Sequence, residues 1–178
     1  MSLTRLYHGT TSDFGTVDVN EGRGYKDFGK GFYLAADRDH AVRLALRNKA
    51  FLEKKSYKNT PRTVTAYLYE FDFDFSLLNR FNSKVFETAD FEWIKFVLAN
   101  RDCETKAHDY DIVTGPTADD LTNASIQTYY SGLYGEQGSD KALTTLIQML
   151  ETENLSTQIY FGNQAAANEL IFVKRSRI

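Results

Sequence analysis

The feature that most constrains the fold is the stretch TVTAYLYEFDFDF at positions 63–75, in which residue types alternate with a period of two. Successive residues of a β-strand point to opposite sides, so its aromatic side chains share one face and its acidic side chains share the other. The aromatic set is Tyr67, Tyr69, Phe71, Phe73 and Phe75, and the acidic set is Glu70, Asp72 and Asp74. The pattern predicts a half-buried strand in an antiparallel or mixed sheet, with a polar face in water.

Strand and helix patterns alternate irregularly along the rest of the chain. Short apolar runs predict strands, and apolar residues at helical spacing predict helices. The predicted strands lie at 4–9, 31–35, 110–115, 157–163 and 169–175, and the predicted helices follow Asp37 or lie near 91–101 and 143–150. Asp37, and Thr117 with Asp120, are typical of helix starts because their side chains accept hydrogen bonds from free backbone amides. We expect a single mixed α+β domain over residues 1–178.

Composition argues against several classes of protein. The chain has 178 residues, 42% of them hydrophobic, so it can bury an ordinary core. No apolar run approaches the roughly 20 residues of a membrane span, and residues 1–10 lack the pattern of a secretory signal. A net charge of −3 gives no general attraction to nucleic acid or anionic lipid. The single cysteine, Cys103, favours a cytoplasmic protein, and the scattered histidines His8, His40 and His108 predict no metal site.

The glycine-containing segment KDFGKGFYLA, residues 26–35, first suggests nucleotide chemistry. Asp-Phe-Gly is a protein-kinase signature, but the 26 residues before Asp27 are too few to supply the other kinase motifs. A P-loop is excluded because no Ser or Thr follows Lys30, and the start of the chain lacks the strand–glycine–helix unit of a Rossmann site. Locally, the glycines are explained by a turn with positive φ before a strand.

Three separated motifs change this interpretation when they are taken together. LYHGT at 6–10 ends the first predicted strand, GKGFYLA at 29–35 begins the second, and STQIYF at 156–161 begins a late one. In this order they resemble the ADP-ribosyltransferase superfamily, most closely the clade whose triad is histidine, tyrosine and an acidic residue or glutamine. That clade includes the poly(ADP-ribose) polymerases. DFGKGFYL, DIVTGPTADD and QIYF are also similar to an uncharacterised bacterial family assigned to the superfamily.

The resemblance implies an enzyme that breaks the nicotinamide–ribose bond of NAD, its co-substrate, and transfers ADP-ribose to a protein or nucleic-acid acceptor. Such a site must hold the ribose and stabilise the positive charge of an oxocarbenium-like transition state. The implied catalytic residues are His8 on ribose hydroxyls, Tyr33 against the nicotinamide, and Gln158 on the ribose 2′-hydroxyl. Without the resemblance, His8 is equally explained as a strand-end histidine bonded to the backbone, and Tyr33 as a core residue.

The other residues implied to contact NAD lie in three segments. Gly9 would offer its backbone to the nicotinamide amide, and Thr10 would offer a hydroxyl. A flexible loop would cover the dinucleotide, and it would consist of Asp27, Phe28, Gly29, Lys30 and Gly31. Leu44 stands where the family often has a second aromatic side chain.

Two alternatives stay open. A hydrogen bond to a charged group is worth about 1.5–3 kcal/mol and a neutral one about 1 kcal/mol, so Gln158 in place of glutamate predicts transfer roughly ten- to thirtyfold slower. Gln158 and Leu44 together leave open a catalytically weak or inactive NAD-binding module. The other alternative, a transferase acting on phosphorylated RNA, needs a cluster of Arg and His that the sequence does not assemble. By analogy with bacterial relatives, we expect a toxin or effector with a cognate antitoxin as partner.

Overall fold

The computed structural model describes residues 2–56, 63–118, 120–150 and 155–178. The strands of its one mixed sheet are β1 (Leu3–Thr10), β2 (Phe32–Ala35), β3 (Tyr67–Asp74), β4 (Ser83–Val85), β5 (Ile112–Pro116), β6 (Thr157–Phe161) and β7 (Ile171–Arg177). The helices are α1 (Arg38–Ser56), α2 (Phe91–Arg101), α3 (Asp120–Tyr130), α4 (Asp140–Gln148) and α5 (Gln164–Ala167), with 3₁₀ turns at Val19–Glu21 and Phe75–Arg80. The expectation of an α+β protein is confirmed.

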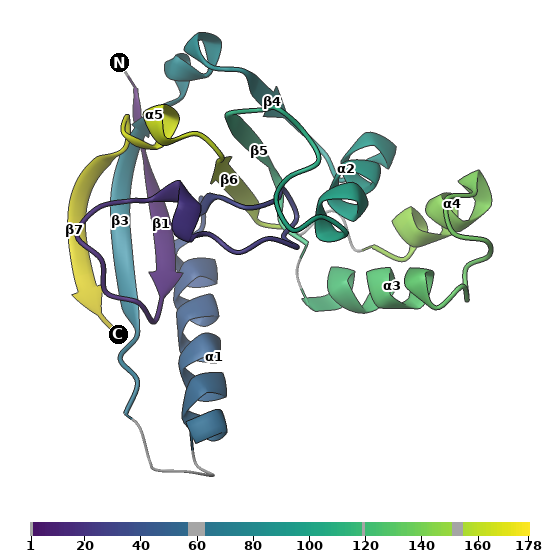
Figure 1. Cartoon of the computed structure of the whole chain (residues 1–178), viewed down its shortest axis with the longest axis horizontal. Coiled ribbons are helices and arrows are strands. Elements are labelled where there is room, and N and C mark those ends of the chain that lie inside the picture. Colours follow the sequence, from purple (N-terminus) through teal and green to yellow (C-terminus); the bar gives the residue numbers. More distant parts are fainter. Residues whose placement is uncertain (1, 57–62, 119, 151–154) are drawn as a thin grey trace.

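The seven strands follow the order β4-β5-β6-β2-β1-β3-β7. All neighbouring pairs are antiparallel except β4 and β5, which are parallel, so the sheet is mixed as expected. In Figure 1, α2, α3 and α4 gather beside the β4–β6 end, α1 runs beside β1 and β3, and the segment between β1 and β2 crosses in front of the sheet. Of the described helices, each is too short or too polar to cross a bilayer.

β3 forms where the alternating pattern predicted it, but the prediction of a polar face in water is wrong. β3 lies inside the sheet between β1 and β7, and seven of its eight residues are buried. Glu70 is only 6% exposed. Its carboxylate is 3.0 Å from the guanidinium of Arg5 on β1 and 3.2 Å from the ammonium of Lys174 on β7. Flanking strands of opposite charge therefore allow an acidic face to be covered.

α1 begins as its sequence predicted. Asp37 Oδ1 accepts a hydrogen bond of 2.8 Å from the backbone amide of Asp39, which satisfies one free donor of the first turn. The predicted pairing of Thr117 with the side chain of Asp120 at the start of α3 lies outside the described side chains.

The faces of β6 show how the core is divided. Tyr160 is buried in a cluster with α2, α3 and α4, whereas Ile159 and Phe161 are buried in a second cluster with β1, β2 and β3. Residues that alternate with Tyr160 on β6 therefore point toward the helical side. Gln158 is one of them, which places its side chain between the sheet and the helices.

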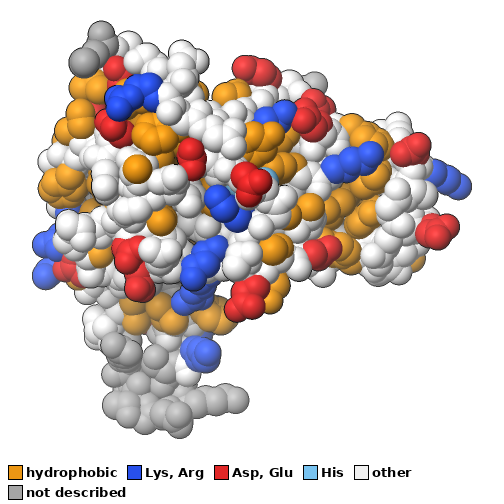
Figure 2. Space-filling model, turned by 45° about the horizontal axis from the view of Figure 1, so that its top comes forward, with side chains coloured by type: hydrophobic (Ala, Val, Ile, Leu, Met, Phe, Trp, Pro, Cys, Tyr) orange, Lys and Arg blue, Asp and Glu red, His pale blue; other side chains and the backbone are white. Residues whose placement is uncertain are grey.

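The opposite end of the sheet is less well covered. β7 is an edge strand, and Ile171, Phe172 and Val173 are all exposed. Figure 2 shows apolar surface at this side of the molecule, next to Lys and Arg side chains.

Candidate functional site

The structure brings two of the three predicted catalytic residues to one face of the sheet. In the antiparallel pairing of β2 with β6, Tyr33 lies opposite Tyr160 and Ala35 lies opposite Gln158, so the Tyr33 and Gln158 side chains point to the same side. The Tyr33 hydroxyl donates to the carbonyl of Gly29 at 2.6 Å and accepts from the amide of Phe28 at 3.1 Å. Burial, together with the negative charge of Asp27, raises the pKa of the Tyr33 phenol well above its usual value, so it stays neutral.

Asp27 is the centre of this group. Its Oδ1 accepts two hydrogen bonds from Arg101, from Nε at 2.9 Å and from Nη2 at 2.7 Å. Its Oδ2 accepts from the amide of Ala118 at 2.9 Å and from Gln158 Nε2 at 2.8 Å. A carboxylate has about four lone-pair sites, and here all four are used. A buried charge is tolerated because it is both paired and fully hydrogen-bonded.

The chemistry of its partners fixes the orientation of the Gln158 carboxamide. Nε2 lies 2.8 Å from Asp27 Oδ2 and 3.3 Å from the Pro116 carbonyl oxygen. Both of these oxygens only accept hydrogen bonds, so the atom facing them must be the nitrogen. Among the described residues, none hydrogen-bonds Gln158 Oε1. Within the described part of the chain, Oε1 is therefore an oriented acceptor without a hydrogen-bond partner, although Gln158 as a whole is only 8% exposed.

His8 lies apart from this group. The register of β1 with β2 contains one pair, Tyr7 with Ala35. Beyond it, His8 Nδ1 lies 2.8 Å from the Tyr33 carbonyl oxygen. Its ring is tilted over Phe32, a member of the second core cluster, with the ring centres 4.6 Å apart. His8 therefore contacts Tyr33 through the backbone and does not meet Gln158.

The hydrogen bond to Tyr33 also sets the tautomer of His8. Burial lowers the pKa of the imidazole, which the bond to the Tyr33 carbonyl only partly opposes, so the ring is neutral at pH 7. A carbonyl accepts, so Nδ1 carries the proton and Nε2 is left as an acceptor. Sequence reasoning had left open a histidine bonded to the backbone, and that contact is present.

The segment Asp27–Gly31, which we expected to be a flexible loop, is packed. Only Lys30 is exposed among its five residues. Phe28 is fully buried and lies beside the rings of Phe86 and Phe96. Gly29 has φ of +87°, the left-handed conformation that glycine adopts at little cost. The buried Phe28 anchor explains why this segment does not stand away from the surface.

The remaining residues predicted to contact NAD are Gly9, Thr10 and Leu44. A methyl group at Gly9 would lie 1.8 Å from the Ala41 carbonyl oxygen, so the glycine lets α1 approach β1 closely. Thr10 Oγ1 accepts from the amide of Ser12 at 3.1 Å. Leu44 is half-buried on α1. None of these three is a hydrogen-bond partner of the Gln158 carboxamide, which bonds Asp27 and Pro116.

Sequence reasoning missed Arg101 and Ala118. They are 74 and 91 positions from Asp27, and no local pattern links them to it. In the described part of the chain, no group of three or more His, Cys, Asp and Glu side chains could hold a metal ion.

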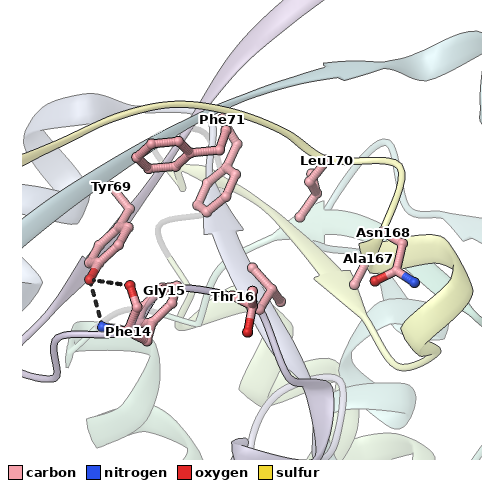
Figure 3. A pocket seen from close by; sticks show the side chains of 10 residues that line it. Phe14, Gly15, Thr16, Tyr69, Phe71, Ala167, Asn168 and Leu170 are labelled. Atoms are coloured by element: carbon pink, nitrogen blue, oxygen red, sulfur yellow. Dashed lines mark hydrogen bonds between the residues drawn. The ribbon is translucent and has the colours of Figure 1, made fainter.

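A hollow of about 310 Å³ lies elsewhere, on the side of the second core cluster. Tyr69 and Phe71 of β3 form an aromatic wall, and Thr16 and Asn168 are polar groups in the lining (Figure 3). The ring of Phe14 stacks on that of Tyr69, with centres 4.0 Å apart. None of the predicted site residues lines this hollow.

A family model described as Protein of unknown function (DUF3990) matches residues 4–172. The chain belongs to this family. The similarity to an uncharacterised family is thereby confirmed. The description of the family names no activity. No curated protein matches it, and no solved structure matches it.

Proposed function

We propose that this chain is an NAD-dependent ADP-ribosyltransferase. One observation carries the proposal beyond the resemblance of its motifs. The side chains of Tyr33 and Gln158 lie on the same face of adjacent strands, and the Gln158 carboxamide presents Oε1 as an oriented acceptor. An acceptor beside an aromatic ring fits a ribose hydroxyl next to a nicotinamide.

In the proposed reaction, the bond between the ribose C1′ and the nicotinamide nitrogen breaks, nicotinamide leaves with the electron pair, and a nucleophilic group of the acceptor bonds to C1′ and loses its proton. Gln158 Oε1 would accept a hydrogen bond from the ribose 2′-hydroxyl and hold the sugar in place. Tyr33 would pack against the nicotinamide ring. His8 would contribute by holding the Tyr33 carbonyl and hence the position of β2.

An NAD-binding module without turnover is the second candidate function. It is favoured by the low exposure of Gln158 and by the internal hydrogen bonds of the Tyr33 hydroxyl to Gly29 and Phe28. Groups already engaged inside the protein are less available to a reacting sugar.

Labelled NAD separates the two candidates. The full chain is incubated with adenylate-labelled NAD in the presence of cell protein and RNA. Nicotinamide release, labelled macromolecules and the NAD-dependent shift in Tm are then measured. Turnover supports the enzyme, and a Tm shift without turnover supports the binding module. The absence of both signals contradicts both candidate functions.

Substitution of Gln158 tests its role. Gln158→Ala is expected to abolish turnover while leaving most of the NAD-dependent Tm shift, because the residue acts on one ribose hydroxyl. The matched control is Gln127→Ala, an exposed glutamine on α3, which should behave as wild type. Equal turnover in Gln158→Ala and wild type would show that the assigned role is wrong.

A further inference from the structure

The contact with Asp27 determines which atom of the Gln158 carboxamide, oxygen or nitrogen, points inward. The terminal torsion of glutamine is broad and close to two-fold, so an unrestrained carboxamide exposes oxygen or nitrogen with similar ease. In this chain two acceptors, Asp27 Oδ2 and the Pro116 carbonyl, face the same nitrogen. Rotating the carboxamide by 180° would put oxygen against oxygen at 2.8 Å, next to a buried negative charge.

Asp27 is itself prevented from turning. Arg101 holds its Oδ1 with two nitrogens, and Arg101 is fixed in turn by a 2.6 Å hydrogen bond from Nη1 to Asn123 Oδ1. The amide of Ala118 holds the other oxygen. Helices α2 and α3, the end of β5 and the start of β6 thus all contribute to the orientation of one amide.

We propose that Asp27 is a positioning residue for Gln158, which fixes the carboxamide with Nε2 inward and Oε1 as the acceptor for the ligand hydroxyl. This inference rests on the proposed function. It also explains why an amide stands at position 158. With Asp27 in place, a glutamate at that position would bring two carboxylates to the same short contact.

Two carboxylates at that separation cannot both be ionised without strong repulsion, so such a pair would share one proton and titrate at a raised pKa. The amide and the carboxylate can also be exchanged between positions 27 and 158. An asparagine at 27 keeps its oxygen toward Arg101, which only donates, and turns its Nδ2 toward position 158 and toward the amide of Ala118, whose hydrogen bond is lost in the single and the double variant alike. There it would repel the amide of Gln158 and donate to a glutamate. Asp27→Asn and Gln158→Glu should therefore each be harmful alone and partly compensate together.

The test compares four full-length proteins: wild type, Asp27→Asn, Gln158→Glu and the double variant. Turnover of NAD is measured from pH 5 to pH 9, and kcat and KM are separated. Asp27→Asn should lower kcat about tenfold, the effect of one lost hydrogen bond in the transition state, with little change in KM. Turnover by Gln158→Glu should fall as the pH rises, because the carboxylate pair loses its shared proton.

The double variant should recover about threefold in kcat over Asp27→Asn, which is part of the tenfold loss, and lack the pH dependence of Gln158→Glu. The control is Asp111→Asn, because Asp111 Oδ1 accepts a 2.8 Å hydrogen bond from Asn163 Nδ2, the same kind of contact in a distant turn. It should have wild-type kinetics. The Tm of every variant is measured, and kinetics are compared at a temperature where all are folded.

The outcomes separate the two proposals. If wild type consumes NAD and Asp27→Asn is equally active, only the role of Asp27 is overturned. Recovery of folding without recovery of kcat in the double variant also overturns it, because the contact is then only structural. A wild-type protein that neither binds nor consumes NAD overturns the proposed function, and with it any role of Asp27 toward that ligand.

Discussion

Two buried carboxylates, Asp27 beside the helices and Glu70 within the sheet, are neutralised in different ways. The cation that pairs with Asp27 is Arg101, whose side chain is 16% exposed. The cations that pair with Glu70 are Arg5 and Lys174, whose side chains are 38% and 59% exposed. Both members of the Asp27–Arg101 pair are largely buried, whereas Glu70 is buried and its two cations are partly in water.

The partners also differ in origin. Glu70 is held by the strands on either side of it, so its contacts reinforce the register of β1, β3 and β7. Asp27 is held by α2, by the segment before α3 and by β6, so its contacts join the sheet to the helical layer. The comparison indicates that Asp27 matters more to stability and that it alone reaches the candidate site.

The largest effect is expected from Asp27→Ala. Removing this carboxylate leaves the largely buried guanidinium of Arg101 without a counter-charge and the amide of Ala118 without its acceptor, while Gln158 Nε2 keeps only the longer contact with the Pro116 carbonyl. Breaking a buried pair in this way costs about 3–5 kcal/mol in the free energy of unfolding. Chemical denaturation of the variant and wild type measures the difference. A loss below about 1 kcal/mol would show that water replaces the carboxylate, and the contrast with Glu70 would fail.

A smaller loss, about 1–2 kcal/mol, is expected from Glu70→Gln, because Arg5 and Lys174 can turn to water. Burial of Glu70 opposes its ionisation, but hydrogen bonds from Arg5 and Lys174 outweigh it and hold the pKa of the carboxyl below its usual 4.5. Its stabilising contribution is therefore present above that pH and is lost as the pH falls through the lower folded pKa. Wild type and Glu70→Gln should converge in unfolding free energy under acid conditions.

The smallest effect is expected from a neutral group, the imidazole of His8. Its pKa is lowered by burial, so the unfolded chain binds the proton more readily, and wild-type stability should decline as the pH falls below 6.5. His8→Phe should flatten this decline while leaving the share due to His108, whose pKa burial also lowers. Unfolding free energies between pH 5 and 8 provide the slopes, and parallel slopes would contradict the assignment.

Elements with a strong local pattern could be predicted from the sequence. The alternation in β3 and the cap at Asp37 depend on neighbours in the chain, and both features are present. The burial of Glu70 could not be predicted, because it depends on which strands flank β3. Arg5 and Lys174 are 65 and 104 positions away, and their own segments show no pattern that joins them to it.

The candidate site divides in the same way. Motif resemblance grouped Asp27, Tyr33 and Gln158, and these residues lie together. It also grouped His8 with them, but Tyr7 pairs with Ala35 on the Gln158 face, so the next residue, His8, points to the other face, where it meets Phe32 and Phe14. Arg101 was missed because a basic residue at the end of a helix is common and needs no distant partner.

Gly9 sets a limit on how the candidate site can open. With no side chain between them, the backbone of β1 meets that of α1 at Ala41 directly, and the two elements have no rotamers to rearrange at this point. They should behave as one rigid wall. Widening beside Tyr33 must then come from the segment of Phe28 and Gly29, whose backbone amide and carbonyl hold the Tyr33 hydroxyl.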